Sequence, residues 1–500
     1  MTVRGVERVV VVGRDAPLWI AAVSLKTALG RAGVEVQVVQ LPSLLSPVDV
    51  YAALPSLQAL HRLIGIDEPL LLEAAQGLPM VGQRFSNWSG SAPPFIHAFD
   101  TPPQAGSDLE FVHYWTKARG EGLKVALEDF SLGAVAARSG RVPAPPDDPS
   151  QPSAGYGYHL DAISYTSLLR QLAAHRRIAI TSGSISDIEL AGASIAAVHL
   201  ASGERIEADV FVDASGPEAV LLSRLPGSDL ESWADLLPCD RVLTATAQRL
   251  DPLPAFSQIS AFRAGWTGLF PLADRTGVVA VYDSRTMSDD DLVQSLPILA
   301  RVPIAGDALV TNLRPGVRRN SWIGNCVAVG EAAIALEPLD AVQLHLAHLT
   351  VTNLIALFPV ETGNFAEAQA YNRLVRAHAE NLRDFQFAHY RLNRRFDEPL
   401  WDVARDVPVP ATLAPKLAMF RRRALALLHD YETFEGANWT AILVGHGLIP
   451  EDYDPRVDLL SEAEHIARVQ DRLRIIGATV PSYATVSEHM AAAATQAAHA

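Results

Sequence analysis

The hydrophobic pattern of the first forty residues predicts a strand, a helix and a second strand. Val9 to Val12 form a fully apolar, β-branched run closed by Gly13, which is typical of a buried parallel strand. Residues 18–29 have helical periodicity, and residues 34–39 (VEVQVV) have the composition of a second strand. A βαβ start of this spacing is typical of Rossmann-type dinucleotide folds, so the sequence predicts an α/β protein.

The pattern further along the chain predicts a hairpin, a long helix and a loop. Residues 195–212 alternate as a hairpin followed by a strand, and residues 366–396 have helical periodicity with charged faces. Residues 142–153 are rich in Pro, Asp and Ser, which predicts a loop or insertion. The low-complexity tail at 490–500 (MAAAATQAAHA) is expected to be frayed.

Composition and charge narrow the class of protein. Hydrophobic residues make up 49% of the 500-residue chain and charged residues 19%, which is ample for a large core. The net charge of −15 and the lack of a Lys/Arg-rich block argue against binding to nucleic acid or to an anionic membrane. Neither a leader nor an apolar run of about 18 residues is evident, and the two cysteines are expected to be buried thiols. We therefore expect a soluble, cytoplasmic protein of two or three domains.

The dinucleotide fingerprint is incomplete. Where the G-x-G-x-x-G pattern needs three glycines, the chain has Gly13, Asp15 and Leu18. Asp15 places a carboxylate where phosphates would lie at the helix N-terminus, and Gln40 stands where an acidic residue would bind the ribose. Two interpretations remain open: an altered dinucleotide site, or a βαβ scaffold that binds no dinucleotide.

A resemblance to one family runs from residue 8 to about 455. The segment at 322–346, WIGNCVAVGEAAIALEPLDAVQLHL, resembles the IGNCVA(I/V)G…EPLEST segment of the flavin-dependent tryptophan halogenases. The turn at 213–216 (DASG) also matches a motif common in flavoprotein monooxygenases. The other segments that resemble the family are residues 48–57, 80–88, 156–161 (taken as a helix start), 236–241, 265–271 and 431–455.

The resemblance implies an α/β fold in which an FAD-monooxygenase-like, Rossmann-type module is interleaved with a mainly helical, substrate-covering lobe. The expected FAD-binding-like module comprises residues 1–75 and 150–350, and the expected lobe comprises residues 76–149 and 351–489.

The same resemblance assigns the positions of the site, several of which carry a different residue from the family. Met80 stands at the position of the family's lysine, which receives or positions hypochlorous acid, and a thioether cannot replace an amine. Asp340 stands for the family's glutamate, with Ala341-Val342 in place of the chloride-site Ser-Thr. In the W-x-W-x-I-P signature the second tryptophan is Gly268, which leaves a hole to be refilled or opened as a channel. The expected substrate-pocket residues are His97, Phe99 and Trp266, and the expected cofactor-binding residues are Gly13, Ala16, Gln40, Asp213, Gly216 and Gly330.

Structural interpretations stand beside these functional ones. Met80 is favoured as a core or pocket-lining residue. His97 could equally be a histidine at the surface or in the core whose hydrogen bonds are satisfied, or a residue of the substrate pocket. Asp340 could simply cap the helix expected from Ala341. His345 and His348 have helical i, i+3 spacing, but without a further ligand cluster a metal site is not expected.

The altered positions predict a tryptophan-halogenase-like protein without the family's FADH2-dependent halogenation. Such a protein would act as a partner or regulatory subunit, as a homodimer or as a heterodimer with a related halogenase, or would bind an aromatic small molecule. FAD binding is expected to be weak or absent. The alternative is an active flavin-dependent halogenase or monooxygenase of an indole or other aromatic substrate with an atypical site.

Overall fold

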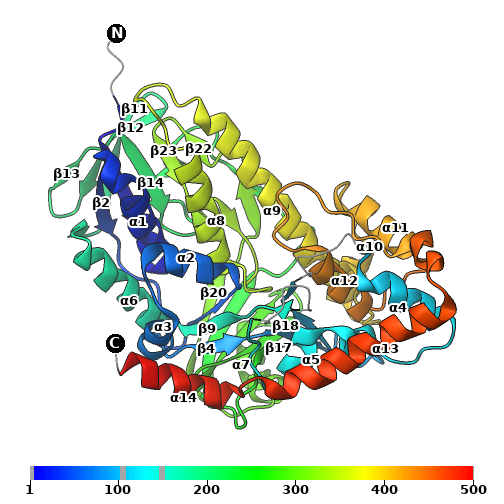
Figure 1. Cartoon of the computed structure of the whole chain (residues 1–500). Helices are drawn as coiled ribbons and strands as arrows, with labels where there is room; N and C mark the ends of the chain where they lie inside the picture. Colours follow the sequence, from blue (N-terminus) through cyan, green and yellow to red (C-terminus); the bar gives the residue numbers. More distant parts are fainter. Residues whose placement is uncertain (1–4, 102–108, 146–152, 499–500) are drawn as a thin grey trace. The chain divides into compact units, whose positions relative to one another are not determined.

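The computed structural model describes residues 5–101, 109–145 and 153–498, which divide into two compact units (Figure 1). Unit 1 holds residues 1–77, 160–234 and 313–379, and unit 2 holds residues 78–159, 235–312 and 380–500. Each unit combines three separate stretches of chain, so the architecture is α/β and interleaved, as the sequence predicts.

Unit 1 is built on a six-stranded sheet whose first five strands are parallel. Its strand order is β10-β2-β1-β14-β23-β22, and only β22 is antiparallel to its neighbour. The all-valine interior of β1 is completely buried, because a parallel strand is covered on both faces. The strands are β1 (Arg8–Gly13), β2 (Glu35–Gln40), β10 (Ala179–Ser182), β14 (Val210–Ala214), β22 (Trp322–Ile323) and β23 (Cys326–Ala328).

The helix α1 (Asp15–Leu29) completes the predicted βαβ start. It is buried over most of its length because it packs against both α6 and α8 (Figure 1). The other helices that lie wholly in unit 1 are α2 (Ser56–Ile64), α3 (Glu68–Ala74), α6 (Ala162–His175) and α8 (Gln343–Ala356). The smaller strands of this unit are β3 (Val50–Ala53), β11 (Ile185–Ala191), β12 (Ser194–Leu200), β13 (Arg205–Ile206), β15 (Leu230–Ser232), β21 (Gly316–Arg318) and β24 (Ile334–Ala335).

Unit 2 is built on a seven-stranded sheet of order β20-β16-β19-β18-β17-β5-β6, in which only β17 and β5 run parallel. Helix α7 (Asp289–Ala300) packs against this sheet and closes a core of Leu, Ala, Val and aromatic residues. The strands are β5 (Gly82–Ser86), β6 (Phe95–Ala98), β16 (Arg241–Gln248), β17 (Phe256–Phe262), β18 (Gly265–Pro271), β19 (Arg275–Tyr282) and β20 (Ile304–Asn312).

The remaining elements of unit 2 are mainly helical. Here β4 (Leu78–Met80) runs antiparallel to β9 (Gly157–Asp161), whose first three residues belong to this unit, and β7 (Asp100–Thr101) pairs with β8 (Ser153–Ala154). Its helices are α4 (Phe111–Gly120), the 3₁₀ helix η2 (Leu127–Phe130), α5 (Leu132–Arg138), α10 (Pro399–Asp406), α11 (Leu413–Arg423), α12 (Gly436–Gly445), α13 (Glu462–Thr479) and α14 (Val486–Ala497). The long helix α9 (Glu367–Arg391) begins in unit 1 and ends in unit 2.

The structure differs from the sequence-based expectation at several boundaries. Residues 235–312, expected in the FAD-binding-like module, belong to unit 2 because β17 pairs with β5. The segment expected to begin a helix at 156–161 contains strand β9, and Asp161 then caps α6 by accepting the Ser164 N–H. The tail expected to be frayed is helical to Ala497. Of the expected loop at 142–153, residues 146–152 lie outside the described residues.

Within the described residues, no helix is both long and apolar enough to cross a membrane. Cys239 and Cys326 are both buried and are not joined in a disulfide, and the Cys239 sulfur lies 3.3 Å from the Tyr390 hydroxyl.

Candidate functional sites

The N-terminus of α1 is where a Rossmann-type fold would bind a pyrophosphate. Gly13 is required there by packing, because a Cβ at this position would clash with the Ala214 carbonyl of the neighbouring strand β14. Asp15 has a left-handed backbone (φ 58°), and its carboxylate accepts the Ser43 hydroxyl at 2.5 Å and the Leu44 N–H at 3.3 Å. The carboxylate predicted from the sequence is therefore fixed at the first turn of the helix.

Tyr51 fills part of the same region. The Ala16 backbone N–H hydrogen-bonds the Tyr51 hydroxyl, which opposes a strong rise in the pKa of this phenol. That rise comes first from burial and then from Asp15, Glu331 and Asp49. Burial, together with Asp15, also raises the pKa of Glu331 to about 7. The Ala16 amide in the first turn of α1 is thus already hydrogen-bonded within the chain, and acidic side chains lie close to its partner Tyr51.

The other expected cofactor positions in unit 1 serve the turns of the fold. Asp213 is completely buried and accepts the Ser215 hydroxyl and N–H and the backbone N–H groups of Leu221 and Leu222. Burial raises the pKa of Asp213, and these hydrogen bonds oppose the rise. Gln40 ends β2, where its Oε1 lies 3.4 Å from the Ser182 hydroxyl.

Gly216 and Gly330 both have a left-handed backbone, with φ 91° and φ 60°. A Cβ at Gly216 would meet nothing within 4 Å, whereas one at Gly330 would touch Ala347 of α8. The Gly330 N–H donates to the Thr350 hydroxyl at 2.8 Å. Both glycines are therefore explained by backbone conformation, and only Gly216 borders open space.

Asp340 lies in a left-handed pair of residues before α8. Asp340 and Ala341 have φ values of 59° and 58°, a conformation that costs free energy for any residue other than glycine. Because α8 begins at Gln343 with Val342 at its N-cap, the expectation that Asp340 caps a helix beginning at Ala341 is wrong. Asp340 is buried, and the nearby His345 Nδ1 is 3.1 Å from the Ser56 hydroxyl.

Met80 is a completely buried member of a polar chain in unit 2. Its sulfur accepts the Ser257 hydroxyl at 3.1 Å, and the same hydroxyl lies 2.7 Å from His159 Nε2. Burial lowers the pKa of His159 to about 3, so the imidazole is neutral at pH 7. Because the serine has one proton, it donates either to the Met80 sulfur or to His159 Nε2, depending on the tautomer of the imidazole. Met80, which the resemblance assigns to the position of the family's lysine, thus belongs to a neutral, hydrogen-bonded cluster.

Gly268, which the resemblance assigns to the second signature tryptophan, is bordered by aromatic rings. Trp266 and Phe270 lie on β18 at two-residue intervals on either side of Gly268, so all three share one face of the strand. A Cβ at Gly268 would lie 2.6 Å from the Phe270 ring and 3.3 Å from the Trp266 ring. The Phe270 ring also stands edge-on to His159 at 5.8 Å. Of the two outcomes expected for this hole, refilling is the one observed.

His97 and Phe99 belong to a separate aromatic cluster in unit 2. The His97 ring lies 5.8 Å from Phe99, 5.4 Å from Phe385 and 5.7 Å from Phe434. His97 Nε2 is 3.2 Å from the Asn438 side-chain nitrogen, and Phe385 stacks on Phe434 at 3.8 Å. The cluster thus joins β6 with α9 and α12 and surrounds His97 with aromatic rings.

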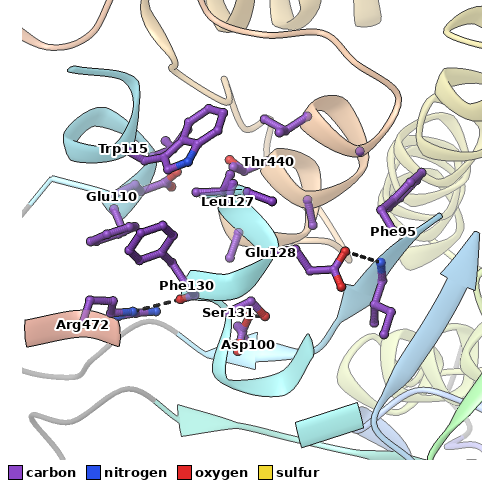
Figure 2. Close-up of a pocket in the computed structure, with 18 of the residues that line it drawn as sticks. Phe95, Asp100, Glu110, Trp115, Leu127, Glu128, Phe130, Ser131, Thr440 and Arg472 are labelled. Atoms are coloured by element: carbon purple, nitrogen blue, oxygen red, sulfur yellow. Dashed lines mark hydrogen bonds between the residues drawn. The ribbon is translucent and has the colours of Figure 1, made fainter. Parts of the chain in front are cut away.

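A large cavity lies elsewhere in unit 2, and no sequence motif indicated it. It has a volume of about 1420 Å³ and lies between β6, α4, η2, α12 and α13 (Figure 2). Its walls include Trp115, Phe130, Glu110 and Thr440, which come from chain segments that no motif connects. Only the three-dimensional arrangement brings these residues together.

Comparison with known proteins places this arrangement in a class. The fold matches that of BrvH, a flavin-dependent halogenase from Brevundimonas sp. BAL3, with a TM-score of 0.90 and 30% identity over 98% of this chain and 99% of that one. It also matches Xcc4156, a flavin-dependent halogenase from Xanthomonas campestris, with a TM-score of 0.91 and 28% identity over 97% and 98%.

The sequence comparison agrees. The family model for tryptophan halogenase matches residues 8–462, so the chain belongs to the tryptophan halogenase family. Tryptophan 7-halogenase KtzQ of Kutzneria sp. (strain 744) is 27% identical over 95% of this chain and 97% of its own length. The resemblance inferred from the motifs is therefore confirmed at the level of family and fold.

Proposed function

We propose that this protein is a tryptophan-halogenase-like protein without FADH2-dependent halogenation that acts as a partner subunit or a small-molecule binder. The observation that carries the proposal is the environment of Met80. A thioether has no proton to donate and forms no haloamine, and its neighbours are a hydroxyl and a neutral imidazole. The buried cluster offers no amine where the resemblance requires one.

The α1 N-terminus supports the same proposal. BrvH and Xcc4156 are described as flavin-dependent halogenases, so FAD is the first ligand to test. A pyrophosphate is stabilised at a helix N-terminus by free N–H groups and positive potential. Here the Ala16 N–H bonds Tyr51, and the carboxyl groups of Asp15 and Glu331 are close enough to Tyr51 to raise its pKa, so a phosphate would meet like charge. These residues do not fit a pyrophosphate, which supports weak or absent FAD binding.

A flavin titration tests the proposal. Purified protein is titrated with FAD and with anaerobically reduced FAD, followed by flavin fluorescence or calorimetry. We expect no saturation below about 1 mM, which corresponds to roughly −4 kcal/mol of binding free energy. The matched variant Asp15→Gly/Tyr51→Phe removes one carboxylate and the hydroxyl that occupies the Ala16 N–H, and should bind at least about tenfold more tightly. Saturation of the unmodified protein in the micromolar range would contradict the proposal.

The partner role has its own test. Light scattering of the purified chain, alone and mixed with an active tryptophan halogenase, should give the mass of a homodimer or of a mixed dimer. A monomer under both conditions would leave small-molecule binding as the proposed role.

An active flavin-dependent halogenase or monooxygenase is the second candidate. The aromatic cluster around His97 favours it, because aromatic rings would suit an aromatic substrate. The assay combines the protein with FAD, a flavin reductase, NADH, halide and indole. A halide-dependent mass increase in the product would favour this candidate over the first.

A further inference from the structure

The strand β20 forms one edge of the seven-stranded sheet of unit 2, and its outer side is open. It is nine residues long (Ile304–Asn312), and on its inner side it pairs antiparallel with β16. Within the described residues, no backbone hydrogen bond joins β20 to any element other than β16. Because the N–H and C=O groups of a strand alternate between its two sides, about half of those in β20 face outward with no strand to pair with.

The other edge strands of the chain are protected against such pairing. In the part of the chain that the structure describes, every other edge strand except β11 has four residues or fewer. The strand β11 has seven residues, but it carries Asp187 and Glu189 and has two shifts of register against β12. Short length, charged side chains and bulges are the devices by which proteins prevent edge-to-edge association of sheets. The open edge of β20 is therefore an exception within this chain.

Protective features are confined to the first half of β20. There the ladder with β16 shifts its register, Gly306 has a left-handed backbone (φ 71°), and Asp307 adds a charge. The second half, residues 308–312 (ALVTN), contains no charged residue, proline or glycine. Leu309 is 43% exposed, whereas the residues on either side of it pack against the core that contains α7. The second half of β20 thus offers five residues of uncharged strand edge.

We propose that residues 308–312 pair antiparallel with the same residues of a second copy of this chain, around a two-fold axis at Val310. A strand edge is self-complementary in this arrangement, because both copies present the same alternation of N–H donors and C=O acceptors. The pairing places Leu309 of each copy opposite Thr311 of the other, on the same face of the joined sheets. This inference rests on the partner-subunit part of the proposed function and assigns a surface to it.

The charges that flank this stretch are complementary to those of a second copy. Asp307 lies three residues before Val310 and Arg314 lies four residues after it, and both side chains are exposed. Neither side chain joins an ion pair within the described residues. In the antiparallel arrangement, Asp307 of one copy comes within about one residue spacing, roughly 3.4 Å along the strand, of Arg314 of the other. The two-fold axis produces this opposite-charge pair twice, once at each end of the paired stretch.

Sedimentation velocity of the full chain tests the pairing. Five residues from each copy make a small interface, so we expect a weak dimer with a Kd between about 1 and 100 µM. Leu309→Lys places two ammonium groups diagonally across the axis, with Cβ atoms about 7–8 Å apart, and should raise the Kd at least about tenfold. Leu190→Lys is the matched control, because Leu190 also lies in an edge strand and is 42% exposed, and it should leave the Kd unchanged.

A charge exchange tests the register of the two copies. Asp307→Arg brings arginines together and should raise the Kd about fivefold, whereas Asp307→Arg/Arg314→Asp should return it to the value of the unmodified chain. A change in the stability of β20 alone would not be reversed in this way.

Two results would overturn the inference and leave the proposed function standing. A dimer whose Kd is the same in Leu309→Lys as in the unmodified chain would place the interface elsewhere, while the partner role would remain. A chain that stays monomeric at the highest concentration would leave small-molecule binding as the proposed role. Flavin binding, which would contradict the loss of halogenation, has no bearing on this measurement.

Discussion

Replacing Met80 by lysine would restore the amine that the family resemblance requires and would place it in a closed site. The Met80 side chain is completely buried, and its sulfur accepts a hydrogen bond from the Ser257 hydroxyl. Burial of this kind lowers a lysine pKa by roughly 3–5 units from about 10.4. At about 1.4 kcal/mol per pKa unit, a 3-unit shift means that burying the charged lysine destabilises the fold by about 4 kcal/mol. One hydrogen bond from the ammonium to Ser257 would offset about 1.5–3 kcal/mol of that loss.

The sign of the pH dependence follows from that shift. With a folded-state pKa near about 7 and an unfolded-state pKa near about 10.4, the folded state binds fewer protons between these values. The destabilisation of Met80→Lys should therefore be largest below about pH 7 and shrink as the pH rises toward about 10. We expect a net loss of about 2 kcal/mol at pH 7 relative to the unmodified protein.

Urea unfolding between pH 6 and 10 would measure this loss of stability, with the fluorescence of the protein's eight tryptophans as the signal. Met80→Leu is the volume-matched control and should cost less than about 1.5 kcal/mol at every pH. Met490→Lys, at a half-buried position near the C-terminus, should show little dependence on pH. If Met80→Lys were as stable as Met80→Leu at pH 7, the ammonium would have access to water, and the site could not be closed as described.

Three further predictions concern buried groups elsewhere. Because the pKa of Glu331 is about 7 and thus above its unfolded value, the free energy of unfolding should fall as the pH rises from about 4.5 to 7. Glu331→Gln should remove that fall, and Asp15→Asn should reduce it. Gly268→Ala should lower the free energy of unfolding by about 1–3 kcal/mol, because the added methyl group would clash with the Phe270 ring. The double variant with Phe270→Leu should lower it by less than the sum of the two single changes, which unfolding experiments would measure. Asp213→Asn turns an acceptor of several buried N–H and O–H groups into a partial donor, and should destabilise the protein to urea by about 2–4 kcal/mol.

The elements that the sequence predicts well are those with strong local patterns. The valines of β1 and the helical period of α1 depend on neighbouring residues, so the βαβ start is confirmed. The strand at 157–161 was missed because Asp161, a good helix cap, lies at its end, and its pairing with β4 is made by residues far away in the sequence.

The candidate site depends more on distant contacts. The family positions Met80 and Gly268 could be found from motifs, but what surrounds them could not. Ser257 lies 177 residues from Met80, and the bond between Ala16 and Tyr51 joins a helix to a strand through the fold. A pattern along the chain identifies which residue has changed, whereas only the packing shows what occupies the space instead.

The interleaving of the two units restricts how such a gene can change. Each unit is completed by three stretches that alternate along the chain with those of the other unit. A truncation that removed either unit would also delete strands or helices that the other unit needs. The remaining polypeptide would not fold stably and would be degraded in the cell. Point substitution is then the main route by which the chemistry can alter while the scaffold persists. A chain that matches the family model over residues 8–462, with Met80 and Asp340 at the positions that the resemblance assigns to a lysine and a glutamate, is what this route would produce.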